Sequence, residues 1–238
     1  MSVVFINGGS RGIGRAMVEL FSANGYTVAF SYNNSEEAAL ELAEKTGARA
    51  IRADSSSESD VKRVCDFLYE EYYAVDILIN NAAVSSFSLF TDLTLDDWRR
   101  TFAVNVDGAF MYCKNLVPYM INKKYGRIIN ISSMWGQVGS SCEVHYSASK
   151  AALIGMTKAL AKELGPSGIT VNCIAPGVID TDMNSALSEA DIAELCTETP
   201  LMRIGEPNDV AEAALFLAGD KAGFITGAVI NVNGGFVV

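Results

Sequence analysis

Residues 3–14 read VVFINGGSRGIG, an apolar run followed directly by four glycines and an arginine. The run predicts a buried strand, and the glycines predict a tight turn into a helix whose free N–H groups can bind an anion. Gly8 would permit the turn, Gly12 would let the backbone approach a pyrophosphate, and Gly14 would let helix and strand pack closely. Glycine-rich loops also serve as plain turns, so this stretch alone leaves both interpretations open.

Beyond this opening, short β-branched runs alternate with longer segments of helical period, which predicts a parallel sheet covered on both faces. We expect strands at 3–6, 27–31, 48–52, 76–80, 127–131, 169–174 and 228–232. We expect helices at 13–24, 36–46, 58–72, 95–123, 146–165 and 207–218. The predicted fold is a Rossmann-like, doubly wound α/β sheet in one domain, 1–238, with a candidate substrate lid at about 183–201.

Composition narrows the function classes. The formal net charge is −10 and the pI is near 4.6, which argues against a nucleic-acid partner. The five cysteines are scattered without metal-ligand spacing, so we expect reduced thiols and no metal site. The first strand begins at Val3 with no basic segment before it, and no apolar run approaches the ~18 residues of a membrane span. We therefore expect a soluble, cytoplasmic protein that does not associate with a membrane.

Arg11, within the glycine-rich loop, bears on which dinucleotide is bound. In sheets that bind NAD, a carboxylate at the end of the second strand usually accepts a hydrogen bond from the ribose 2′-hydroxyl. Here that strand ends in residues 30–35, FSYNNS, and the first acid is Glu36. Arg11, with Asn33 and Ser35, would suit a 2′-phosphate instead, which predicts NADP(H). The alternative is that Arg11 is a solvated loop residue.

A second informative stretch is 146–150, YSASK, at the start of a predicted helix. A four-residue step places Tyr146 and Lys150 on one helical face. Because this spacing is common by chance, its value depends on its surroundings. The strand ending in Ser132 and Ser133 finishes 13 residues before Tyr146, within reach of the same pocket; Ser133 is preferred over Ser132 on this spacing.

Taken together, these motifs resemble the short-chain dehydrogenase/reductase family over Val3 to Gly235. The resemblance is carried by residues 80–83 (NNAA), Asn105, Ser133, Tyr146, Lys150 and Pro176-Gly177. It implies that Tyr146 is the general acid in carbonyl reduction, that Ser133 binds the substrate oxygen, and that Asn105 positions a water in a proton relay. Lys150 would hold the nicotinamide ribose and lower the pKa of Tyr146.

Simple electrostatics supports that role for the lysine. Bringing a phenol from a pKa of about 10 to near 7 requires about 4 kcal/mol. An ammonium about 4 Å away supplies roughly this amount at an effective dielectric constant of about 20.

The resemblance also implies a set of cofactor contacts. Asp54 would meet the adenine amino group, Asn81 and Ala82 would line the ribose, and Ile179 with Thr181 would hold the nicotinamide carboxamide. The full expected set is Gly8, Ser10, Arg11, Gly12, Ile13, Gly14, Asn33, Ser35, Asp54, Asn81, Ala82, Ala83, Tyr146, Lys150, Pro176, Gly177, Ile179 and Thr181.

Within the family the sequence is closest to the 3-oxoacyl-(acyl-carrier-protein) reductases. Three positions depart from the pattern: Asn7 replaces a usual threonine, Ala83 a usual glycine, and Ser167 a basic residue at which an acidic carrier docks. The alternatives are a relative acting on sugars, polyols or steroids, an extended-branch epimerase or dehydratase, and a non-catalytic dinucleotide sensor. The GxxxGxG spacing of the loop glycines and the chain length disfavour the epimerase or dehydratase. The complete catalytic set disfavours the non-catalytic sensor.

Two further expectations concern the assembly of the protein and its contacts with the substrate. Family members of this length usually form homotetramers through two long helices, here 95–123 and 146–165, and the last strand. An acyl substrate, either small or carried by a protein, would meet apolar residues near the lid. Candidates for that wall are Met134, Trp135, Val138, Met183, Leu187 and Leu195, and candidates for a carrier-docking patch are Arg99, Arg100, Lys123, Lys124 and Arg127. His145, the only histidine, is not expected to be the catalytic base.

Overall fold

The computed structural model describes residues 2–185 and 187–238, so position 186 of the expected lid lies outside the described residues. Seven strands form one parallel sheet in the order β3-β2-β1-β4-β5-β6-β7. Their bounds are β1 Val3–Asn7, β2 Thr27–Tyr32, β3 Arg49–Arg52, β4 Ile77–Asn80, β5 Gly126–Ile131, β6 Ile169–Pro176 and β7 Val229–Val232. The strand order reverses direction between β1 and β4, where doubly wound sheets bind their ligands.

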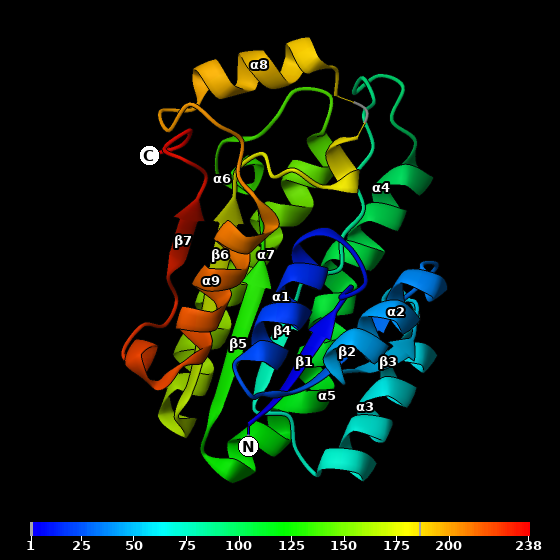
Figure 1. The fold of residues 1–238 in the computed structure, drawn as a ribbon, viewed down its shortest axis with the longest axis vertical. Helices are drawn as coiled ribbons and strands as arrows, with labels where there is room; N and C mark the ends of the chain where they lie inside the picture. Colours follow the sequence, from blue (N-terminus) through cyan, green and yellow to red (C-terminus); the bar gives the residue numbers. More distant parts are fainter. Residues whose placement is uncertain (1, 186) are drawn as a thin grey trace.

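Helices cover both faces of the sheet, as Figure 1 shows, and the predicted doubly wound fold is confirmed. One face is covered by α1 Gly12–Ala23, α2 Glu36–Thr46 and α9 Pro207–Ala218. The other is covered by α3 Glu58–Tyr72, α5 Gly108–Lys123 and α7 Val144–Leu164. The shorter helices are α4 Leu95–Phe102, α6 Trp135–Val138 and α8 Glu189–Glu198.

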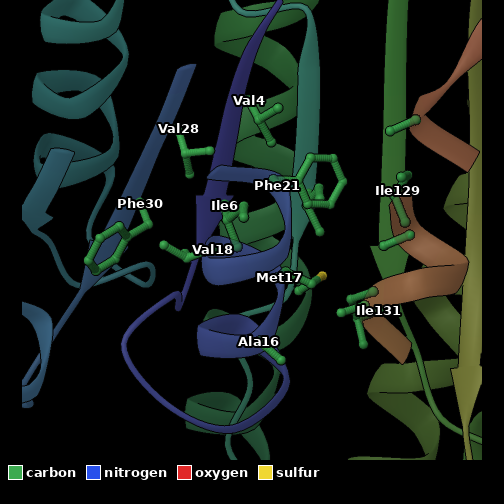
Figure 2. Close-up of a cluster of buried hydrophobic side chains, with 14 of the residues drawn as sticks. Val4, Ile6, Ala16, Met17, Val18, Phe21, Val28, Phe30, Ile129 and Ile131 are labelled. Atoms are coloured by element: carbon green, nitrogen blue, oxygen red, sulfur yellow. The ribbon is translucent and has the colours of Figure 1, made fainter. Parts of the chain in front are cut away.

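The core consists of two apolar layers, one on each face of the sheet. Alternate residues of β1 enter opposite layers: Val4 and Ile6 join α1 in one, and Val3 and Phe5 join α5 in the other. Figure 2 shows the first layer, in which Phe21 of α1 lies beside Val4. Because both faces of β1 are buried, its sequence is continuously apolar. Each such large side chain contributes about 1.5–3 kcal/mol of burial free energy.

The helix predicted at 95–123 differs from the structure in its middle. α4 passes into a π-helical turn at Ala103–Asp107 before α5 begins at Gly108. A π-turn inserts extra backbone without ending the helix, so a helical period read from the sequence does not reveal it. Such turns are frequent at functional sites, and this one contains Asn105.

The expected lid contains a helix of its own. α8 begins with a capping box between Ser188 and Asp191, whose side chain and backbone groups bond reciprocally. In Figure 1, α8 lies across the end of the molecule at which the parallel strands finish. The segment therefore stands over the edge of the sheet where a ligand is expected.

Candidate active site

The glycine-rich loop leaves no room for side chains at Gly8, Gly9 and Gly14. Gly8 has a φ of +69°, and a Cβ there would lie 2.8 Å from the Cα of Ala82. A Cβ on Gly14 would lie 2.1 Å from the carbonyl oxygen of Gly8, inside any acceptable contact. The turn out of β1 and the close packing of α1 on that turn thus both require glycine. α1 then begins at Gly12, with no acidic residue in its first turn.

Asn7 connects this loop to the next one. Its Oδ1 accepts hydrogen bonds from the backbone N–H groups of Asn81 and Ala82, each at 2.6 Å. In return, the Asn81 side chain donates to the carbonyl oxygen of Gly8 at 2.8 Å. The departure from threonine at Asn7 therefore leaves the two loops joined by side-chain hydrogen bonds.

Arg11 stands at the rim of the cleft. Its side chain is 62% exposed and pairs with Asp182 through Nη1 and Oδ2 at 3.5 Å. Across the opening, β2 is followed by the amide and hydroxyl groups of Asn33, Asn34 and Ser35. An exposed pair of this length contributes little free energy, so Arg11 can exchange Asp182 for a stronger anion.

A single cleft gathers nearly all the residues predicted to form the site. It has a volume of about 780 Å³ and runs from the glycine loop to α8. Every expected cofactor contact from Gly8 to Thr181 lines it, together with Ser133, Tyr146 and Lys150. The fourth catalytic candidate, Asn105, lies behind this wall.

The reacting groups expected from the sequence are buried side by side. Tyr146 is 9% exposed, and its phenol lies near enough to the Ser133 hydroxyl for that hydroxyl to lower the tyrosine pKa. The Ser133 oxygen also accepts from the Trp135 N–H at 3.2 Å. Ser132, by contrast, donates to the carbonyl oxygen of Lys150 at 2.8 Å. Ser133 is thus the serine that contacts the phenol.

The pKa of Tyr146 differs from the expectation. Burial, with a smaller contribution from the charge of Glu143, raises this pKa well above its usual range. Lys150 does not offset the increase because burial lowers its own pKa to about 8. Its ammonium also donates to the Ile131 carbonyl oxygen at 2.8 Å. The phenol is therefore held protonated, the state that an acid requires.

Asn105 acts on the cleft through its neighbours. Its Oδ1 accepts from the Val84 N–H at 2.8 Å, and its Nδ2 donates to the Val84 carbonyl oxygen and to the Ser149 hydroxyl, both at 3.0 Å. Only 1% of the residue is exposed. The π-turn thus fixes the loop after β4 against α7, with Tyr146 one turn away.

The structure shows which of the candidate substrate-wall residues line the cleft. Trp135, Met183, Leu187 and Leu195 line the cleft, whereas Met134 is fully buried and Val138 points mostly to solvent. His145 is buried beside the Ser86 hydroxyl, 3.0 Å from its Nε2, and is not among the residues lining the cleft.

The basic residues considered for carrier docking do not form one patch. Arg100, on α4, lines the cleft. Lys123 is bonded to Asp76, beside the starts of β1 and β5, and Arg127 is only 6% exposed. The sequence predicted which helices and strands carry these basic residues. It did not reveal that Arg100 and Lys123 lie at opposite ends of the sheet.

Of the cleft residues that the sequence did not single out, one is a buried acid. Glu143, immediately before α7, is 6% exposed, lines the cleft, and accepts a hydrogen bond from the Ser85 hydroxyl at 2.5 Å. An acid just before a helix is an ordinary N-terminal residue. The only sequence signal was its position three residues before Tyr146.

Comparison with known proteins identifies the family. Residues 8–237 match the family model described as enoyl-(acyl carrier protein) reductase. A doubly substituted short-chain dehydrogenase/reductase of Serratia marcescens superposes with a TM-score of 0.93 at 37% identity, covering 100% of this chain and 98% of that one. The chain belongs to the short-chain dehydrogenase/reductase family of oxidoreductases.

Individual relatives give finer detail about what the chain resembles. The 3-oxoacyl-(acyl-carrier-protein) reductase FabG of Aquifex aeolicus is 41% identical, with 98% of this chain and 96% of that protein covered. The uncharacterized oxidoreductase YmfI of Bacillus subtilis is 38% identical, with 97% of each covered. A blue fluorescent protein from a metagenomic library, solved in complex with NADPH, gives a TM-score of 0.94 at 39% identity, covering 100% of this chain and 98% of that one.

Across residues 2–185 and 187–238, none of the helices combines the length and apolar character needed to span a bilayer.

Proposed function

We propose that this enzyme uses NADPH to reduce the 3-keto group of an acyl thioester, carried by an acyl carrier protein, to a 3-hydroxyl group. One observation carries the proposal: the neighbouring hydroxyls of Ser133 and Tyr146 share a cleft with the glycine loop and Arg11. Hydride chemistry belongs to the cofactor, and the protein supplies orientation and a proton.

The chain's residues fit a phosphorylated dinucleotide. A Cβ at Gly12 would project to 3.1 Å from Thr181 across the loop, so glycine keeps open the space above the start of α1. The N–H groups there suit a pyrophosphate. Arg11 and the neutral residues 33–35 suit a 2′-phosphate, because no carboxylate at the end of β2 repels it.

The protein groups divide the work of the proposed reaction. When bound, the nicotinamide supplies a hydride to the carbonyl carbon. The Tyr146 O–H donates its proton to the carbonyl oxygen, and Ser133 donates a hydrogen bond to the same oxygen. Lys150 would bind the cofactor's ribose, and Asn105 would hold the surrounding loop. The raised pKa of Tyr146 favours reduction because the acid starts protonated.

The apolar wall of the cleft supports an acyl substrate. Phe87, Trp135, Met183, Leu187 and Leu195 present apolar side chains on the side of the lid. Hydroxyl groups of a polyol placed against them would lose their hydrogen bonds to water without replacement, which costs about 1–3 kcal/mol for each buried group.

One observation favours a second candidate, reduction of a small ketone that carries hydroxyl groups, such as a sugar. Glu143, Ser85 and Ser140 form a polar segment of the otherwise apolar wall. They could accept and donate hydrogen bonds to such a substrate.

A substrate panel tests the proposal. NADPH consumption would be measured with 3-oxoacyl thioesters of short to medium length, with sugars, and with simple ketones. We expect the thioesters to give the highest kcat/KM. Absence of thioester activity together with rapid NADP⁺-linked oxidation of a sugar or polyol would contradict it.

A further inference from the structure

Glu143 is a buried acid beside the reacting groups that the reaction as described does not use. It directly precedes α7, three residues before Tyr146, and both residues line the cleft. Burying a carboxylate is costly unless hydrogen bonds or an opposite charge compensate it. Its surroundings must therefore provide that compensation, or a ligand must.

The protein compensates only one of its two carboxylate oxygens. Oε1 accepts from Ser85 at 2.5 Å, and Oε2 has no hydrogen-bond donor among residues 2–185 and 187–238. Oε2 is not sealed in the interior either, so it remains accessible from the cleft that Glu143 lines.

No basic side chain of the described residues forms an ion pair with this acid. Of the cations lining the cleft, Lys150 donates to the Ile131 carbonyl oxygen and Arg11 pairs with Asp182. Arg100, the third, belongs to α4 and has no ion pair with Glu143 in the described chain. A carboxylate with one vacant acceptor in a largely apolar wall is suited to a donor that arrives with the substrate.

We propose that Glu143 determines substrate specificity by accepting a hydrogen bond from a donor group on the carbonyl substrate. An ammonium group binds it best, a neutral hydroxyl or amide N–H binds less well, and a carboxylate is rejected. This inference rests on the proposed carbonyl reduction and narrows its substrates to those bearing a donor near the reacting carbonyl. A carrier-linked thioester satisfies it through amide N–H groups.

The wild-type enzyme provides the first test. Matched series of short ketones would carry an ammonium, a hydroxyl, a methyl or a carboxylate group at the same carbon, with the spacing to the carbonyl varied between series. At the spacing that suits Glu143, kcat/KM should fall in that order, by about tenfold between ammonium and methyl, the effect of a hydrogen bond to a charged group. A preference for methyl or carboxylate over ammonium at every spacing would overturn the inference.

Substitution of Glu143 tests whether this residue, and not the rest of the cleft, sets the preference. Glu143→Gln keeps an oxygen acceptor for Ser85 but removes the charge, so the ratio of kcat/KM for the ammonium ketone to that for the methyl ketone should fall to near one. Asp96→Asn, the same chemical change at an exposed position on α4, should leave the order unchanged. An unchanged order in Glu143→Gln would also overturn the inference.

The outcome is distinguishable from failure of the proposed function. If no ketone in any series is reduced, carbonyl reduction itself is wrong. If ketones are reduced without discrimination, carbonyl reduction stands and the role of Glu143 is wrong.

Discussion

The Nζ atom of Lys150 lies 5.5 Å from the centre of the Tyr146 ring while it donates a hydrogen bond to the carbonyl oxygen of Ile131 at 2.8 Å. The ammonium is thus anchored to the end of β5 rather than to the phenol. This arrangement keeps a buried cation beside the acid and has a measurable cost in stability.

Replacing Lys150 by methionine should make the folded protein more stable. Burial lowers the pKa of Lys150 from 10.5 to about 8, a difference worth about 3 kcal/mol. The unfolded chain binds the proton more tightly between those values, so wild-type stability rises with pH there. The advantage of Lys150→Met should therefore be largest below pH 8 and vanish towards pH 10.5. Denaturant unfolding at several pH values measures it, and a less stable variant at pH 7 would contradict the account.

Arg11→Ala should weaken NADPH binding far more than NADH binding. Loss of a charge-assisted hydrogen bond costs about 1.5–3 kcal/mol, or about tenfold or more in affinity. Arg15→Ala is a matched control because Arg15, on the helix that follows Arg11, pairs with Glu19 and Glu41 and does not line the cleft. Fluorescence titration with both cofactors gives the comparison, and equal losses for NADPH and NADH would refute the assignment.

Glu143→Gln should shift the pH profile of alcohol oxidation. Oxidation needs the Tyr146 phenolate, and the charge of Glu143 disfavours that form by raising the phenol pKa. Removing the charge lowers this pKa, so the rise in rate should move to lower pH. The other charged residues lining the cleft remain in place: Arg11, Asp54, Arg100, Lys150 and Asp182. A shift to higher pH would contradict this electrostatic role.

Asn7→Ala should loosen the cofactor loops. Two backbone N–H groups lose their acceptor, which should reduce the free energy of unfolding by about 2 kcal/mol. Asn7→Thr, whose hydroxyl oxygen can accept, should recover part of it. Asn24→Ala, at the exposed end of α1, is the control. Thermal unfolding would test this, and no loss in Asn7→Ala would show that the connection is unimportant.

We also predict a homotetramer. Phe110 on α5 is 52% exposed and Phe216 on α9 is 51% exposed, which leaves apolar surface on helices outside the cleft. Light scattering at micromolar concentration measures the mass directly, and a monomer would refute this prediction.

The sequence predicted the features that depend on local pattern. The apolar strand before the glycine loop and the Tyr146–Lys150 step each followed from a period or a spacing. The structure brings the glycine loop, Tyr146 and Lys150 to one cleft. The π-turn at 103–107 was missed because one extra residue barely disturbs a helical period.

Burial and charge compensation could not be predicted in the same way. The raised pKa of Tyr146 comes mainly from burial, which depends on distant segments, whereas its lysine neighbour is visible as a four-residue step in the sequence. Glu143 was overlooked because its burial against Ser85 depends on two segments that are 58 residues apart in the chain.

The central claim is that Tyr146 donates the proton in NADPH-dependent carbonyl reduction, and Tyr146→Phe tests it most directly. The measurement is turnover with a 3-oxoacyl thioester, paired with NADPH affinity by titration. We predict a loss in kcat of about 10²–10⁴-fold, the contribution typical of a general acid, with NADPH affinity within a few-fold of wild type. A variant that retains most of its kcat would contradict the account.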